Sequence, residues 1–142
     1  MPAAYTIDES RSIVLSRAWG VVTDGDLFAH ARTLAADPRF RPHFRHFSDF
    51  RDSTRTDITR TGLRHHSNLN PFGQGARRAI VVGSDVVYGM GRMYQVMRAE
   101  DGDELEVFRD ADLAFDWLGI AAADRAALLA LLAQAPAIDV GE

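Results

Sequence analysis

The sequence contains no cysteine and no lysine, and all 16 of its basic residues are arginine. Without cysteine, disulfide bonds, zinc–thiolate sites, iron–sulfur clusters and cysteine nucleophiles are excluded. Without lysine, Schiff-base chemistry and the lysine of a phosphate-binding P-loop are excluded as well. No apolar run approaches the roughly 18 residues that a membrane span needs, and the first residues lack the pattern of a signal peptide. We therefore expect a cytoplasmic protein with no membrane span.

The composition is that of an ordinary globular domain. The chain has 142 residues, of which 46% are hydrophobic and 25% are charged. A chain of about 150 residues buries enough apolar surface to build one core. The net charge of -4 at pH 7 argues against a nucleic-acid partner, because such proteins present a net basic face.

Apolar periodicity predicts five strands and five helices along the chain. Strands are expected at residues 5–8, 12–19, 44–50, 79–82 and 105–108. Helices are expected to begin near Thr23, Asp57, Ser84, Asp110 and Ala121. Residues 23–26 have the form of a capping box, and the polar residues 50–54 are expected to form a loop that leaves the third strand.

The order of these elements predicts the fold class. The short connection between the first two strands makes them antiparallel, whereas helices separate the later strands and make them parallel. We expect an α/β fold with a mixed, mostly parallel five-stranded sheet, an N-terminal antiparallel hairpin, flanking helices and an extra C-terminal helix. That last helix carries leucines on more than one side, which favours burial or docking on a second copy of the chain.

Element order and spacing across the chain carry a resemblance to a known family. The segments that carry it are residues 5–8, 17–20, 24–27, 49–51, 77–82, 87–94, 107–110 and 117–119. Together they resemble the STAS domain of bacterial anti-sigma factor antagonists, in its SpoIIAA-like group, which is often described jointly with CRAL-TRIO lipid-binding domains. The resemblance covers residues 4–119 and implies a non-catalytic domain, with residues 120–142 as a C-terminal helical extension.

The resemblance does not extend to the regulatory phosphoserine of the antagonists. Their helix start has the form Asp-Ser-Ser-Gly-Leu, and the matching residues here are Thr59-Arg60-Thr61-Gly62-Leu63. Arg60 stands where the phosphoacceptor serine would be, and arginine cannot accept phosphate. A shifted acceptor stays open at Ser53, Thr54, Thr59 or Thr61.

An interaction or anion site is expected beyond the carboxyl ends of the parallel strands. In open α/β sheets, ligands bind there because helix N-termini point at that edge. The expected ends are residues 52–54, 84–85 and 109–110, and some of their side chains are also ordinary helix caps. The candidate residues are Ser53, Thr54, Thr59, Thr61, Ser84 and Arg109.

A methionine stripe gives the second candidate site. Met90, Met93 and Met97 recur at helical spacing with Tyr94 beside them. Methionine adapts to irregular shapes, so the stripe fits either an apolar ligand pocket or simple core packing. With nearby aromatic residues, the candidate pocket comprises Met90, Met93, Tyr94, Met97, Phe50 and Phe72.

The sequence shows no catalytic, cofactor-binding or metal-binding pattern. The adjacent His65 and His66 point about 100° apart on a helix, so they cannot share a metal ion well. The five histidines are instead expected at the surface or at an interface. The glycine pairs lack the spacing of a dinucleotide site, and there is no serine-hydrolase elbow.

Two functions follow as hypotheses, and an enzyme is left as a less favoured third, because no nucleophile–base or metal pattern is visible. The first is a non-catalytic STAS-like interaction or regulatory module that binds a protein partner or itself, as a homodimer. The alternative is a carrier or sensor of a small apolar, lipid-like ligand. A cavity of roughly 300 Å³ or more favours the alternative, whereas a two-fold interface above roughly 1,000 Å² favours the interaction module.

Overall fold

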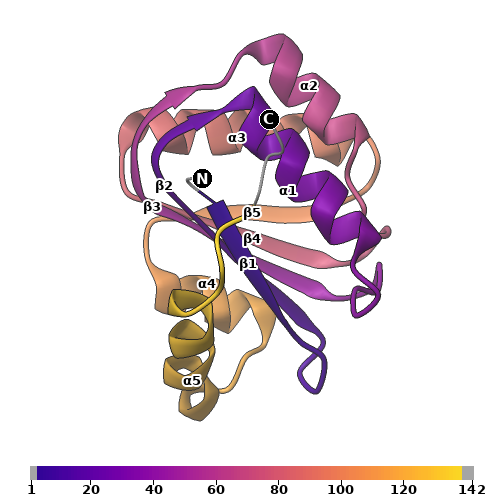
Figure 1. The fold of residues 1–142 in the computed structure, drawn as a ribbon, viewed down its shortest axis with the longest axis vertical. Coiled ribbons are helices and arrows are strands. Elements are labelled where there is room, and N and C mark those ends of the chain that lie inside the picture. Colours follow the sequence, from indigo (N-terminus) through magenta and orange to yellow (C-terminus); the bar gives the residue numbers. More distant parts are fainter. Residues whose placement is uncertain (1–2, 139–142) are drawn as a thin grey trace.

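The computed structural model describes residues 3–138, which form one five-stranded sheet with helices on both faces (Figure 1). The strands lie in the order β1-β2-β3-β4-β5. They are β1 (Ala3–Asp8), β2 (Ile13–Thr23), β3 (Arg45–Asp57), β4 (Arg77–Val82) and β5 (Glu104–Phe108). Only the β1–β2 pair is antiparallel within the described part of the chain. The predicted α/β fold class is confirmed.

The helices divide into two layers. They are α1 (Asp24–Ala36), α2 (Arg60–Asn68), α3 (Asp85–Ala99), α4 (Ala111–Leu118) and α5 (Ala122–Ala133). Figure 1 shows α1, α2 and α3 on one face of the sheet and α4 and α5 on the other. Since side chains alternate between the two faces along each strand, each strand contributes to both layers.

Local sequence signals set most helix starts. The predicted capping box is present, with Thr23 Oγ1 accepting from Asp26 N and the Asp26 carboxylate accepting from Thr23 N. At the starts of α3 and α4, the Ser84 side chain accepts from Val87 N, and the Asp110 side chain accepts from Asp112 N and Leu113 N. Gly119 ends α4 in the left-handed region, at φ 77°, where glycine is favoured.

The predicted exit loop over residues 50–54 is wrong, because β3 continues to Asp57. β2 also continues, to Thr23, and the two extensions pair from Trp19 opposite Asp52 to Thr23 opposite Asp57, with register shifts on the way. Residues 51–57 are polar and lack an apolar alternation, so their pairing with β2 left no signal in the sequence. Ser53 is consequently a buried strand residue, at 7% exposure.

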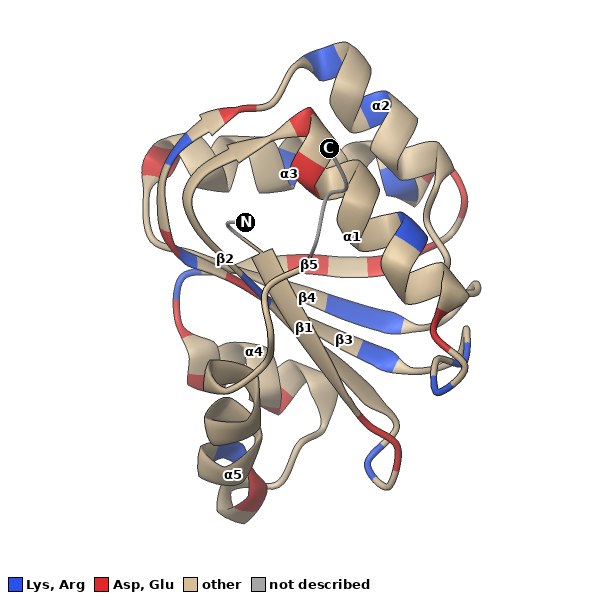
Figure 2. Cartoon of the chain, viewed as in Figure 1, with Lys and Arg blue, Asp and Glu red and all other residues tan. Residues whose placement is uncertain are grey.

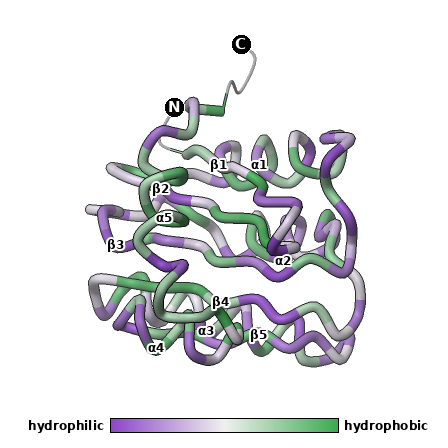
Figure 3. The backbone as a smooth tube through the Cα atoms, turned by 90° about the horizontal axis from the view of Figure 1, so that it is seen from below, coloured by the Kyte–Doolittle hydropathy of each residue, from purple (hydrophilic) through white to green (hydrophobic). Residues whose placement is uncertain are grey.

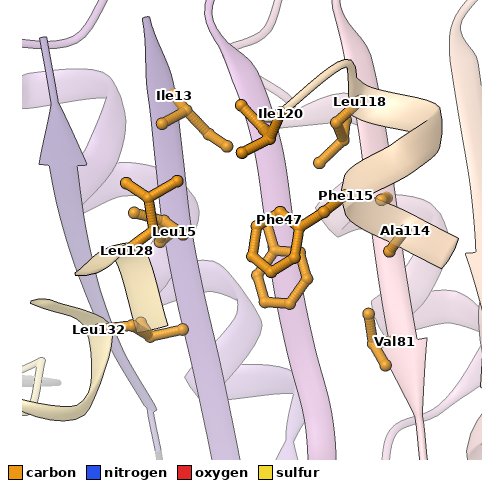
Figure 4. Packing of buried hydrophobic residues seen from close by; sticks show 11 residues of the cluster. Ile13, Leu15, Phe47, Val81, Ala114, Phe115, Leu118, Ile120, Leu128 and Leu132 are labelled. Atoms are coloured by element: carbon orange, nitrogen blue, oxygen red, sulfur yellow. The ribbon is translucent and has the colours of Figure 1, made fainter. Parts of the chain in front are cut away.

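The α4–α5 layer holds the larger apolar cluster (Figure 4). The rings of Phe47 and Phe115 stack with centroids 4.2 Å apart, both fully buried. From α5, Leu128 and Leu132 pack against this cluster, which includes β2 residues of the same chain. The mostly apolar α5, visible in the hydropathy colouring of Figure 3, therefore covers the sheet of its own chain.

The segment after α5 returns to the sheet edge. Ile138 N donates to Ala3 O at 2.8 Å, and Ala4 forms an antiparallel bridge with Ala137. This bridge lies beside β1, on the edge opposite β5. The predicted boundary between a domain over residues 4–119 and an extension over 120–142 stays a prediction.

The start of α2 is fixed on α1 by one carboxylate, which gives a testable expectation. Asp24 accepts from Thr59 N at 2.9 Å and from Thr59 Oγ1 at 2.7 Å, and a Cβ on Gly62 would overlap that carboxylate. Gly62→Ala is expected to lower the free energy of unfolding by about 1–2 kcal/mol, because it displaces the cap. Urea unfolding followed by circular dichroism measures this loss.

Gly89→Ala is the matched control for this substitution. Gly89 lies in the interior of α3, is exposed, and a Cβ there meets nothing within 4 Å. Alanine in place of glycine should raise stability by about 0.5–1 kcal/mol at such a site. Equal effects of the two substitutions would contradict the role assigned to the Asp24 contact.

Candidate functional site

A cavity of about 100 Å³ lies between the sheet and the α1–α3 layer. Most of its wall is apolar, with side chains from both the helices and the strands. This apolar part includes Leu27, Ile58, Leu63, Ile80, Met90 and Leu105. The remaining wall carries polar side chains that are uncommon in a protein interior.

The sheet supplies four of these polar groups from neighbouring strands. Ser16 on β2 lies opposite Ser48 on β3, and His46 on β3 lies opposite Arg78 on β4. All four are at most 6% exposed and all four line the cavity. We call Ser16, His46, Ser48 and Arg78 the polar base.

Hydrogen bonds connect the polar base to α1. Ser16 Oγ lies 2.7 Å from His30 Nε2 and 2.8 Å from His46 Nε2. A hydroxyl has one proton to donate, so one imidazole accepts from Ser16 and the other donates to it. Ser48 Oγ lies 3.1 Å from His46 Nε2 and extends the chain of contacts.

Arg78 is the buried cation of the polar base. Its Nη1 donates to Asp103 Oδ2 at 3.2 Å and its Nη2 donates to Tyr94 OH at 2.9 Å. The guanidinium also lies 4.8 Å from the ring centre of Phe72, in cation–π contact. Figure 2 shows the basic start of β4 from which it projects.

A single buried carboxylate serves two guanidinium groups in this region. Asp103, whose side chain is 4% exposed, also accepts from Arg98 Nε at 2.8 Å. Arg98 is itself 8% exposed, and its second acidic partner, Asp101, lies at the surface with its side chain 65% exposed. The buried group of Arg78, Arg98 and Asp103 therefore carries one positive charge in excess.

Burial keeps the histidines around the cavity neutral at pH 7. It lowers the pKa of His30 to about 4, and the charge of Arg78 lowers it further. Burial also lowers the pKa of His66 to about 3, with additional contributions from His30 and Arg78. Burial likewise places the pKa of His46 well below its usual value. Each neutral ring offers one N–H donor and one acceptor nitrogen.

The expectation that the histidines lie at the surface or an interface is wrong for His30, His46 and His66. They line the cavity, while His43 and His65 are exposed. A signal was present in the strands, because Ser16, His46 and Arg78 each stand next to a fully buried apolar residue, respectively Leu15, Phe47 and Ala79. A polar residue at a core-facing position of a buried strand points to a partner or a ligand.

The predicted pocket residues fall into two groups. Phe50, Met90 and Tyr94 line the cavity. Met93 and Met97 belong to the apolar cluster around Leu63 and Leu105, outside the cavity wall. Phe72 packs in a separate cluster and stacks on His46, with ring centroids 4.7 Å apart.

The predicted interaction or anion residues lie at separate places. Ser53 Oγ donates to Gly20 O at 3.4 Å, and Thr54 is exposed on β3. Thr59 caps α2, and Thr61 is exposed in its first turn.

Ser84 and Arg109 are brought to the same edge of the sheet. Ser84 caps α3, and Arg109 Nη2 donates to Asp85 Oδ1 at 2.8 Å, beside that cap. Both lie beyond the carboxyl ends of β4 and β5. The six predicted residues therefore fall into three pairs, on β3, at the start of α2, and at this edge of the sheet, and do not form one site.

Two further properties of residues 3–138 bear on function. Their His, Asp and Glu side chains do not gather in groups of three that could hold a metal ion. No helix in this part of the chain has the length and apolar character to cross a membrane.

Comparison with known proteins gives a likeness in fold. The crystal structure of an uncharacterized DUF3478-family protein with a SpoIIAA-like fold, from Shewanella loihica PV-4, matches this chain with a TM-score of 0.54. The two sequences are 20% identical, and the match covers 82% of this chain and 93% of that protein. No protein-family model and no curated protein matches the sequence. The expected resemblance to the SpoIIAA-like fold is confirmed.

Proposed function

We propose that this chain, which has the SpoIIAA-like fold, is a non-catalytic module that binds a small, mainly apolar molecule in the cavity under α1–α3. The observation that carries the proposal is the cavity itself, with an apolar wall over a polar base. Ligand pockets characteristically combine a mainly apolar lining with a few converging polar groups. The fold places those groups on rigid strands, where they keep their positions.

The size of the cavity limits the ligand. About 100 Å³ is below the roughly 300 Å³ at which pockets for drug-sized molecules begin. It is closer to the engineered cavity of about 150 Å³ that binds benzene. The cavity does not reach the roughly 300 Å³ that would favour a carrier of a lipid-like ligand, and the ligand proposed here is a molecule of a few carbon atoms.

The side chains around Ser16 support binding rather than catalysis. Ser16 sits between two imidazoles whose pKa values are lowered by burial, so both are weak bases at pH 7. A nucleophilic serine is ordinarily paired with a base that a third polar group orients. Among residues 3–138, neither His30 nor His46 has a carboxylate hydrogen-bond partner.

Filling the cavity tests the proposal. Ala18 is 6% exposed, lines the cavity and lies two residues along β2 from Ser16, on the same face. Ala18→Leu adds three carbon atoms inside the cavity. We expect it to weaken binding of 1-butanol at least tenfold and to change stability by less than about 1.5 kcal/mol.

Methyl NMR of protein labelled at methionine gives the readout. Met90 lines the cavity, whereas Met93 and Met97 lie outside its wall, so they serve as internal references. In the wild type, 1-butanol should shift the Met90 methyl signal in a saturable manner. Ala127→Leu, on the exposed side of α5, adds the same atoms elsewhere and should leave that response intact. An unaltered response in Ala18→Leu would contradict the proposal.

A second candidate is contact with another copy of the chain. It is supported by the outer surface of α3, where Val86 and Val96 are 67% and 64% exposed. Large apolar side chains this exposed on a helix are candidates for a contact with another protein surface. Sedimentation over a range of concentrations tests it, since self-association through α3 should be lost in a Val86→Ser/Val96→Ser double variant.

A further inference from the structure

The two ends of the cavity differ in the polarity of the side chains that line them. The polar base lies near the starts of β3 and β4, since His46 and Arg78 are each the second residue of their strand. Toward the carboxyl ends of the strands, the wall is formed by apolar groups such as Val22, Phe50 and Val87. A molecule that fits this gradient has one polar end and a short apolar body.

The polar base presents hydrogen-bond donors around a positive charge. Its hydroxyls, its neutral imidazole and the guanidinium of Arg78 can all donate. Arg78 Nε is buried and has no hydrogen-bond partner among the described residues. A buried donor without an acceptor is destabilising, so an acceptor beside Arg78 Nε stabilises the site.

The remaining charged groups of the wall do not neutralise Arg78. The Asp26 carboxylate accepts from Thr23 N and belongs to the cap of α1. Arg17 Nε donates to Leu132 O, on the α5 side of the sheet. Asp103 is shared between Arg78 and Arg98, and the second carboxylate of Arg98, Asp101, lies at the surface, so the buried part of this group holds two guanidinium groups and one carboxylate.

We propose that the polar base holds a carboxylate, so that the ligand is a short-chain organic acid with its apolar body toward Phe50 and Met90. This proposal rests on the binding function proposed above. Arginine is suited to carboxylates because its planar N–H groups match their two oxygens. An inorganic phosphate would leave the apolar wall without contact, and a neutral alcohol would offer Arg78 Nε only a neutral acceptor in place of a charged one.

Three probes of similar size distinguish a carboxylate ligand from a neutral one. We expect the wild type to bind butyrate about tenfold or more tightly than butyramide or 1-butanol, because hydrogen bonds to charged groups are the stronger ones. Calorimetric titration measures the three affinities. Equal or weaker binding of butyrate overturns the carboxylate assignment and leaves the binding function standing. Failure of all three probes to bind overturns the binding function itself.

Two variants test whether Arg78 binds the carboxylate of the ligand. Arg78→Gln should weaken butyrate binding about tenfold or more and weaken 1-butanol binding much less, so that the preference for butyrate is lost. Arg98→Gln is the matched control, since Arg98 bonds the same Asp103 but does not line the cavity. It should retain the preference for butyrate. Unchanged butyrate binding in Arg78→Gln overturns the proposal.

If Arg78→Gln does not fold, the protonation state of bound butyrate in the wild type tests the proposal instead. The carboxyl signal of [1-13C]butyrate distinguishes the ionised acid from the neutral acid when it is bound. At pH 6.5, butyrate bound beside Arg78 should remain a carboxylate. Butyrate bound as the neutral acid would overturn the proposal.

Discussion

Asp103→Asn is expected to lower the free energy of unfolding by about 3–5 kcal/mol, because it leaves buried guanidinium groups without their anion. Asp103 accepts from both Arg78 and Arg98, and the three side chains are at most 10% exposed. Asparagine keeps the shape of the side chain but removes its charge. Chemical unfolding at pH 7, followed by circular dichroism, measures the loss.

The loss of stability in Asp103→Asn should come from the burial of the ion pairs, and not from the removal of an ion pair alone. Arg55 and Asp57 also form an ion pair, at 3.5 Å, but their side chains are 69% and 57% exposed. Asp57→Asn should therefore change stability by less than about 1 kcal/mol. Similar losses for the two variants would contradict the idea that Asp103 is the counterion of a buried charge cluster.

Mild acid is expected to destabilise the folded chain through its buried histidines. In the unfolded chain a histidine has its ordinary pKa of about 6.5, whereas burial lowers the pKa of His30 to about 4 and that of His66 to about 3 in the folded state. Between these values the unfolded state binds more protons, so stability falls as the pH falls. From His30 alone the loss reaches roughly 3 kcal/mol by pH 4.

Urea midpoints at pH 7, 6, 5 and 4.5 measure this dependence. His30→Gln should flatten the profile between pH 6.5 and pH 4.5, since it removes one of the groups that take up a proton on unfolding. His43→Gln is the control, because His43 is exposed. An acid profile that is identical in His30→Gln and the wild type would contradict the burial of a neutral imidazole there.

Much of the fold was predictable from the sequence because its signals are local. Short connections and helical crossovers decide which strands are antiparallel or parallel, and caps such as Thr23, Ser84 and Asp110 mark helix starts. The second half of β3 was not predictable, because its polar residues are held by pairing with β2. That pairing depends on both segments together, so neither segment shows a periodic pattern of apolar residues on its own.

The candidate site was predictable only in its apolar part. Met90 and Tyr94 were selected from a helical stripe, and both line the cavity. The polar base was missed because Ser16, His46 and Arg78 are far apart in the sequence and become neighbours only through strand register. Each of them is a polar residue beside a fully buried apolar residue of its strand, and the three together are the signal of a buried polar site.

A crystal structure determined under xenon pressure shows directly whether the folded chain contains a cavity that small molecules enter. Xenon occupies apolar cavities of this size. We expect xenon between α1–α3 and the sheet, in contact with Ile80 and Met90, and its absence from crystals of Ala18→Leu. A wild-type structure in which side chains fill that space, with no xenon bound there, would contradict this expectation.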